Sequence, residues 1–149
     1  MDNTHYLNSK YALKFCKGLG ATGNHPEYSD EISACVQIIE YLKQHLDDQV
    51  IYHLTISKLR HLTGFSFTDE TLIRAAIHLA HIKDSLLQVG FEYINEEGMT
   101  VTLEKDELEL INTEDVYVDR YSGEEFTNAQ ESTFMYFFAT EDIEGKLID

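Results

Sequence analysis

The spacing of apolar residues predicts two helices in the first third of the chain. Over residues 5–17 apolar side chains recur every fourth position, which places them on one helical face. A longer amphipathic stripe starts at a capping residue, Ser29 or Asp30, and continues to about Asp47. Its apolar members are Ile32, Cys35, Val36, Ile39, Leu42 and Leu46.

The following segment predicts a short strand and then two more helices. Residues 50–54 are short and partly β-branched, which is typical of a small strand. Thr55 and Thr68 each precede an apolar stripe, and their hydroxyls can cap a helix. Gly64 ends the first of these helices. The second carries acids in its first turn, where the helix dipole favours them, and is expected to be long.

The apolar pattern changes to period two after Gly90. Residues 91–94 and 99–103 alternate on both sides of a turn that contains glycine, which predicts a β-hairpin. Nearer the C-terminus the pattern leaves two alternatives open, because the apolar run is short. Residues 127–138 fit a helix, and residues 133–139 fit a strand.

The order helix, small strand, short helix, turn, long helix, hairpin over residues 30–104 resembles the winged helix-turn-helix superfamily. Its helix-turn-helix would be TISKLRHLTGFSFTDETLIRAAI (55–77), and its wing GFEYINEEGMTVTL (90–103). The resemblance implies a compact three-helix core that binds DNA in many members and proteins in others. We therefore expect a mainly α fold with a small β-hairpin, of the α+β class. An N-terminal helix and loop (1–29) would precede this domain, and an acidic, aromatic-containing extension (105–149) would pack on or beside it.

The distribution of charge changes the expectation for a partner. The 149 residues carry a formal net charge of −16 at pH 7. Residues 1–90 hold 10 acidic and 8 basic side chains, whereas residues 91–149 hold 17 acidic and 3 basic ones. A hydrophobic content of 43% is sufficient for a packed core, so the charge does not indicate disorder. The acidic part would repel DNA within about 8–10 Å and would attract a basic partner.

DNA binding by the helix-turn-helix would need basic or polar side chains on the outer faces of its helices. The side chains available for it are Lys58, Arg60, Arg74, His78 and His81. However, Asp69 and Glu70 occupy the start of the long helix, where base edges are normally read. Glu96 and Glu97 at the wing tip would face phosphates. Direct DNA binding is therefore less expected than protein binding, although a homodimer formed through the first helix would double the contacts.

A cluster of aromatic residues near the C-terminus is surrounded by acids. Its rings either complete the core or serve as anchors for a partner. Both can hold together if some rings are buried and others are exposed. The expected anchors are Phe134, Phe137 and Phe138. The expected acidic rim, which would steer a basic partner, comprises Glu124, Glu125, Glu131, Glu141 and Asp142.

No catalytic or cofactor motif is present, so we expect neither an enzyme nor a cofactor. His78 and His81 lie three positions apart, but a metal site needs a third ligand that nothing in the sequence fixes. Cys16 and Cys35 match no metal spacing and are interpreted as small buried hydrophobic residues. No apolar run approaches the roughly 20 residues of a membrane helix, and no signal peptide is visible. We therefore expect a cytoplasmic protein without membrane contact.

The leading hypothesis is a non-enzymatic winged-helix adaptor or regulatory subunit. It would bind a protein partner that has a basic surface through its acidic C-terminal side. In size and acidity the chain is similar to winged-helix accessory subunits of multi-component bacterial machines, including those attached to chromosome-organising ATPases. One alternative is a DNA-binding transcription regulator that uses residues 55–87. Another is a DNA mimic that inhibits a nucleic-acid-binding protein.

Overall fold

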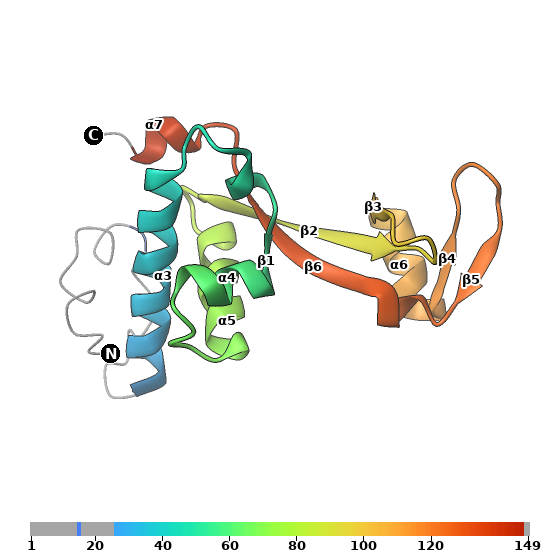
Figure 1. Ribbon diagram of the computed structural model, residues 1–149, viewed down its shortest axis with the longest axis horizontal. Coiled ribbons are helices and arrows are strands. Elements are labelled where there is room, and N and C mark those ends of the chain that lie inside the picture. The colour runs from blue at the N-terminus through green and yellow to red at the C-terminus, as the bar shows by residue number, and fades with distance from the viewer. Residues whose placement is uncertain (1–14, 16–25, 148–149) are drawn as a thin grey trace. The chain divides into compact units, whose positions relative to one another are not determined.

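The structure, a computed structural model, describes Phe15 and residues 26–147 (Figure 1). The helix predicted over residues 5–17 lies outside the described residues except for Phe15, which is helical and buried. The elements in chain order are the helix α3 (Pro26–Gln44), the 3-10 helix η1 (Gln49–Tyr52), β1 (Leu54–Thr55), α4 (Ile56–Leu62), α5 (Asp69–His81), β2 (Leu87–Ile94), β3 (Thr100–Thr102), α6 (Lys105–Glu114), β4 (Val116–Val118), β5 (Glu125–Thr127), the 3-10 helix η2 (Ala129–Ser132), β6 (Thr133–Ala139) and α7 (Ile143–Leu147).

The chain forms two compact units. The first combines the chain up to Val89 with the segment from Phe137 onwards, and the second comprises Gly90–Tyr136. The chain enters the second unit along β2 and leaves it along β6. The boundaries of these units differ from those of the predicted domain (30–104) and extension (105–149). The predicted wing and most of the predicted extension fall together in the second unit.

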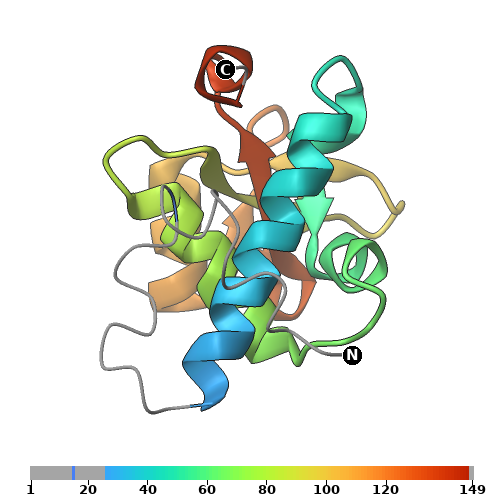
Figure 2. The same cartoon turned by 90° about the vertical axis from the view of Figure 1, so that its left-hand side faces the viewer.

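The first unit is built on three packed helices. Figure 2 shows α3 crossing in front of α5, with α4 to one side, and α3 contacts both of them. The predicted apolar stripe of α3 is confirmed from Cys35 to Leu42, whose members are fully buried, but the helix ends at Gln44, so Leu46 lies beyond it. Its predicted start was wrong by about one turn, because the helix already begins at Pro26. Proline is favoured in the first turn of a helix, where its missing N–H would find no partner.

Two predicted helix caps are confirmed. The hydroxyl of Thr55 accepts a hydrogen bond from the backbone N–H of Lys58 at 3.2 Å. The hydroxyl of Thr68 accepts a hydrogen bond from the backbone N–H of Thr71, also at 3.2 Å. Each bond satisfies a backbone donor that the first turn of a helix leaves without a partner. The caps therefore fix where α4 and α5 begin.

The strand predicted over residues 50–54 was mostly wrong. The carboxylate of Asp48 accepts a hydrogen bond from the N–H of Val50 at 3.0 Å, and this contact starts the 3-10 helix η1. Only Leu54–Thr55 is extended, as β1. Likewise α5 ends at His81, although the sequence predicted a long helix and assigned residues 55–87 to the helix-turn-helix.

The second unit contains the predicted hairpin. Strand β2 pairs with β3 in antiparallel fashion, with Tyr93 opposite Val101. The side chain of Asn95 accepts hydrogen bonds from the N–H groups of Glu97 and Met99, at 3.0 and 2.9 Å, and so fixes the turn. Gly98 adopts a φ of 79°, a left-handed conformation that glycine tolerates best.

A second hairpin and a further strand complete this unit. Strand β4 pairs with β5, with Tyr117 opposite Phe126. Residues 133–139 form the strand β6, which decides between the two alternatives left open by the sequence. The larger sheet has the strand order β1-β6-β2-β3. The fold is therefore mixed helix and strand with a small antiparallel sheet. The second hairpin, β4–β5, is the part of the strand content that the sequence did not predict.

Candidate partner-binding site

Three aromatic rings stack in the second unit. The ring centroid of Tyr93 on β2 lies 4.2 Å from that of Tyr117 on β4. The ring centroid of Tyr117 lies 6.5 Å from that of Phe126 on β5. Tyr117 and Phe126 share a face because they are directly opposite in the antiparallel register. Tyr93 and Tyr117 belong to a core cluster completed by Ile111 and Ala129. Burial raises the pKa of both tyrosine hydroxyls.

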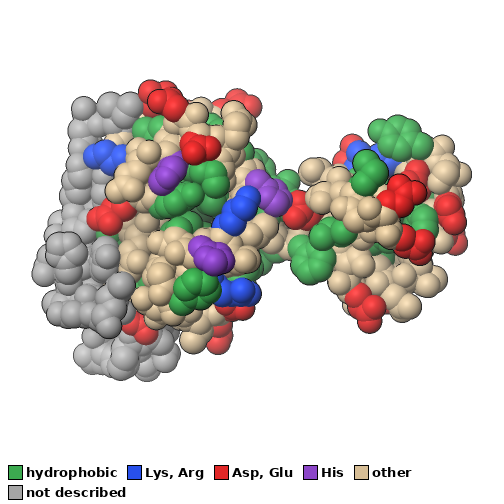
Figure 3. Space-filling view, in the orientation of Figure 1, with side chains coloured by type: hydrophobic (Ala, Val, Ile, Leu, Met, Phe, Trp, Pro, Cys, Tyr) green, Lys and Arg blue, Asp and Glu red, His purple; other side chains and the backbone are tan. Residues whose placement is uncertain are grey.

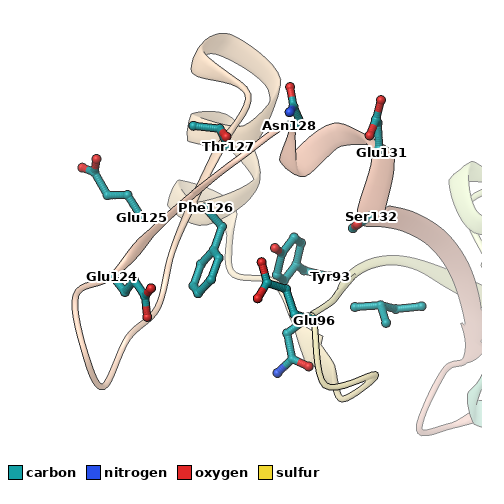
Figure 4. A pocket seen from close by; sticks show the side chains of 11 residues that line it. Tyr93, Glu96, Glu124, Glu125, Phe126, Thr127, Asn128, Glu131 and Ser132 are labelled. Atoms are coloured by element: carbon teal, nitrogen blue, oxygen red, sulfur yellow. The ribbon is translucent and has the colours of Figure 1, made fainter.

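A hollow of about 450 Å³ lies beside this stack (Figure 4). One wall comes from the end of β2 and the turn that follows it, and the other from β5 and η2. The lining residues are Tyr93, Ile94, Asn95, Glu96, Glu124, Glu125, Phe126, Thr127, Asn128, Glu131 and Ser132. The hollow thus has aromatic residues in its wall and polar residues around them.

Four of the lining residues are glutamates, and none is basic. Glu96, Glu124, Glu125 and Glu131 are all exposed. Figure 4 shows their carboxylates at separate positions around the hollow, with Glu125 on the side of β5 opposite to Phe126. The described residues also contain no group of three or more His, Cys, Asp or Glu that could hold a metal ion. The carboxylates therefore form a rim and do not converge on one ion.

The charge of the second unit is almost entirely negative. Gly90–Tyr136 contains 13 acidic and 2 basic side chains, a formal net charge of −11. Figure 3 shows carboxylates spread over this unit. A carboxylate also acts within the site, because Glu96 adds to the rise in the pKa of Tyr93 that burial causes. A basic ligand would meet a negative field before it reached the hollow.

One of the two cations holds the β4–β5 hairpin in place. Arg120 follows β4 and binds both carboxylate oxygens of Glu107 on α6, at 2.7 and 3.0 Å. It also donates to the backbone carbonyl of Thr102 on β3. Hydrogen bonds from Arg120 lower the pKa of Glu107. The hairpin that supplies one wall of the hollow is therefore tied to two neighbouring elements.

The structure brings together part of the predicted acidic rim. Glu124, Glu125 and Glu131 line the hollow. Glu141 and Asp142 belong to the first unit, where Asp142 forms an ion pair with Lys146 at 2.9 Å. The predicted rim is thus divided between the two units.

The three predicted aromatic anchors differ in exposure. Phe134, in the second unit, is 48% exposed and remains available to a partner. Phe138 is half-buried in the first unit. Phe137 is fully buried, so its predicted role as a surface anchor is corrected to that of a core residue. Successive strand residues point to opposite faces, and β6 therefore cannot present both Phe137 and Phe138 in the same way.

Sequence reasoning missed the residues that build the wall of the hollow. Tyr93 and Phe126 were not among the predicted site residues, and Glu96 was interpreted only as a wing-tip acid. The signal that could have located them is the run Val116–Val118, a short β-branched segment with a central tyrosine. Read as half of a second hairpin, it would have placed Tyr117 opposite an aromatic residue.

The cations of α4 have partners within the protein. Lys58 donates to the backbone carbonyl of His53 at 2.7 Å. Arg60 pairs with Asp69 through two hydrogen bonds, at 2.7 and 3.2 Å. If Lys58 or Arg60 bound a DNA phosphate, that side chain would have to give up its internal hydrogen bonds or share them with the phosphate.

Arg74 on α5 is held between two carboxylates. It lies 3.2 Å from Glu31 of α3 and also pairs with Glu70 one turn earlier on α5. Glu31 is only 3% exposed. A buried carboxylate requires a compensating charge, so Arg74 has a structural role.

The two histidines of the predicted DNA-contacting stripe also bond internally. His78 Nε2 forms a hydrogen bond of 2.8 Å with the carbonyl oxygen of Phe15. His81 Nδ1 forms one of 2.9 Å with the carbonyl oxygen of Ile77, in its own helix. The five side chains predicted for nucleic-acid contact thus each have a partner inside the protein. This arrangement weakens the electrostatic term on which DNA affinity depends.

None of the helices in the described part of the chain combines the length and the apolarity that a membrane crossing requires.

Comparison with known proteins identified no relative. No protein-family model matches the chain, and neither does any of the curated proteins or of the solved structures.

Proposed function

We propose that the protein is a non-enzymatic adaptor or regulatory subunit that binds a protein partner through the acidic hollow of its second unit. One observation carries the proposal. The hollow combines the half-buried ring of Phe126, supported from inside by the buried Tyr93, with four exposed carboxylates, and no basic side chain lines it. Aromatic residues supply much of the affinity at protein interfaces, and the surrounding charges select the partner.

The chemistry of the hollow favours lysine or arginine as the contacting residue. Phe126 is half-buried, so part of its ring is open to a ligand. A lysine or arginine side chain can lay its apolar stem on such a ring and bring its charge to a carboxylate. A carboxylate or phosphate ligand would instead be repelled by Glu96, Glu124, Glu125 and Glu131.

The first unit supports a structural role for the helix-turn-helix. The helices α3, α4 and α5 with β1, followed by the β2–β3 hairpin that continues into the second unit, resemble a winged-helix domain in their order, and we propose a winged-helix-like arrangement for these elements. The basic side chains of α4 and α5 already have internal partners. These helices therefore act as a scaffold, and the partner contacts the acidic unit.

Affinity purification from the native cell, followed by mass spectrometry, tests this function. The hollow variant carries Glu96→Gln, Glu124→Gln, Glu125→Gln and Glu131→Gln. The control variant removes the same number of exposed charges from the same unit but outside the hollow, by Glu97→Gln, Asp106→Asn, Glu109→Gln and Glu114→Gln. We expect the wild type and the control to capture the same basic-surfaced protein, and the hollow variant to lose it. Equal capture by all three would contradict the proposal.

Two additions to this experiment distinguish the alternatives. A gel shift with random duplex DNA at low salt should show no retardation at micromolar protein. Retardation that Arg60→Gln, a change in an exposed side chain of α4, abolishes would favour a transcription regulator. Excess duplex should leave partner capture unchanged, whereas competition by duplex would favour a DNA mimic.

A further inference from the structure

In the part of the chain that the structure describes, no strand pairs with the outer hydrogen-bonding edge of β5. The smaller sheet consists of β4 and β5 alone. Asp119 N donates to Glu124 O at 2.9 Å, just beyond the ladder. Hydrogen-bonded and non-hydrogen-bonded pairs alternate along an antiparallel ladder. Phe126 is therefore bonded to β4, and the backbone N–H and C=O groups of Glu125 and Thr127 point away from it.

These outward groups are exposed and unused. Glu125 and Thr127 are both exposed. Within the described residues, these outward groups form no hydrogen bond with the backbone of another segment. An edge of this kind can pair with another extended chain, in the binding mode known as strand addition.

The hollow lies along this same edge. Each residue from 124 to 128 lines it, whereas no residue of β4 does. The hollow is therefore on the outer side of β5. Glu96 and Glu131 border it as well. A strand of three residues, matching β5, would be about 10 Å long.

We propose that an extended segment of the partner, containing lysine or arginine, adds to β5 as the third strand of the β4–β5 sheet. This inference rests on the proposed function and specifies its binding mode. The residue opposite Phe126 would direct its side chain to the aromatic face, and its neighbours would lie on the face of Glu125 and Thr127. The acidic rim favours a basic strand. It disfavours a second copy of β5, because the acidic rims of the two copies would repel each other.

The test uses the full chain, labelled with ¹⁵N, and a defined probe. The probe is the capped peptide Lys-Val-Lys-Val-Lys, which is extended and basic. Its matched control has the same sequence with N-methyl groups on all internal amides, so it keeps the charge but cannot form a ladder. We expect the parent peptide to slow amide exchange at Glu125 and Thr127. We expect the methylated peptide to bind at least about tenfold more weakly, since it loses several hydrogen bonds.

Two variants of the protein test the same edge without changing the peptide. Thr127→Pro removes an outward N–H, and Thr127→Ala retains it. Circular dichroism verifies that both variants fold. Thr127→Pro should weaken binding of the parent peptide, and Thr127→Ala should leave it within about twofold of the wild type.

The outcomes separate failure of this inference from failure of the proposed function. If both peptides bind equally and the hollow variant binds neither, the function holds but strand addition is wrong. If neither peptide binds to the wild type, strand addition is wrong, and the capture experiment with the hollow variant decides the proposed function separately. Self-association without peptide that protects the amides of Glu125 and Thr127 would identify a second copy as the occupant and would also overturn the inference.

Discussion

Arg120 and Glu107 form a two-pronged ion pair, with Nε to Oε2 at 3.0 Å and Nη2 to Oε1 at 2.7 Å. A guanidinium matches a carboxylate in this geometry, which fixes the orientation of both groups. Because Arg120 also reaches the carbonyl of Thr102, a single side chain connects the β4–β5 hairpin with α6 and β3. The position of β5 beside the hollow depends on this connection.

Replacing Arg120 with glutamine should loosen the hairpin. We expect faster amide exchange in Val116–Val118 and Glu125–Thr127 and a melting temperature lower by a few degrees, because Glu107 loses both hydrogen bonds from Arg120. Lys105→Gln, the matched control, removes the other cation of the unit and should change exchange in these strands very little. Equal exchange in the wild type and in Arg120→Gln would show that the pair does not hold the hairpin.

The same pair predicts a dependence of stability on pH. The pKa of Glu107 is lower than its usual value, chiefly because Arg120 donates to its carboxylate. A carboxyl group whose pKa is lowered by folding stabilises the protein at pH values above its pKa in the unfolded chain. This stabilisation is lost as the pH falls through the lower pKa of the folded protein. The difference in melting temperature between the wild type and Arg120→Gln should therefore be largest near neutral pH and shrink between about pH 5 and 3. A difference that stays constant over this range would be inconsistent with the pair.

Gly90 should not tolerate a side chain. A Cβ atom there would lie 2.6 Å from Cζ of Tyr136, closer than such contacts occur. We expect Gly90→Ala to lower the free energy of unfolding by about 1–3 kcal/mol, the usual effect of overpacking, measured by urea denaturation. Gly145→Ala is the control, because a Cβ atom at Gly145 meets nothing within 4 Å.

A double-mutant cycle assigns the effect to this contact. Tyr136→Leu removes the ring that a Cβ at Gly90 would meet, so Gly90→Ala should cost less in that background than in the wild type. If the two substitutions are additive, the ring of Tyr136 is not what excludes a side chain at Gly90.

The two phenylalanines Phe134 and Phe137 of β6 should respond in opposite ways. Phe137→Ala should lower the free energy of unfolding by about 3–5 kcal/mol, because the ring is fully buried. Phe134→Ala should change stability by only about 0.5 kcal/mol, because its ring is 48% exposed. Chemical denaturation of both variants measures the contrast. A large loss of stability in Phe134→Ala would contradict the surface position of that ring.

Features that depend on neighbouring residues could be predicted from the sequence. The caps at Thr55 and Thr68 and the hairpin around Asn95 need only a side chain and the backbone within a few positions. For this reason the composition and periodicity of short segments located them correctly. The start of α3 was missed by about one turn, and the 3-10 helix η1 replaces most of a predicted strand because Asp48 caps it.

Burial and the hollow could not be predicted in this way. Phe134 and Phe137 lie on one strand, and only the packing of its two faces decides which ring is exposed. Tyr93, Glu125 and Glu131 come from different elements and meet because β4 and β5 form a second hairpin. The sequence predicted the acidic character of this region, and the three-dimensional pairing determined which acids share a site.

Photo-crosslinking in the native cell tests the central claim most directly. A benzoylphenylalanine replaces Glu124 at the hollow or, as the control, Glu109 on the exposed side of α6. A third position, His81 on α5, represents the helix-turn-helix. We predict a crosslink to a basic-surfaced protein from position 124, and none to that protein from positions 109 and 81. Crosslinks to a partner or to DNA from position 81, with none from position 124, would contradict the account.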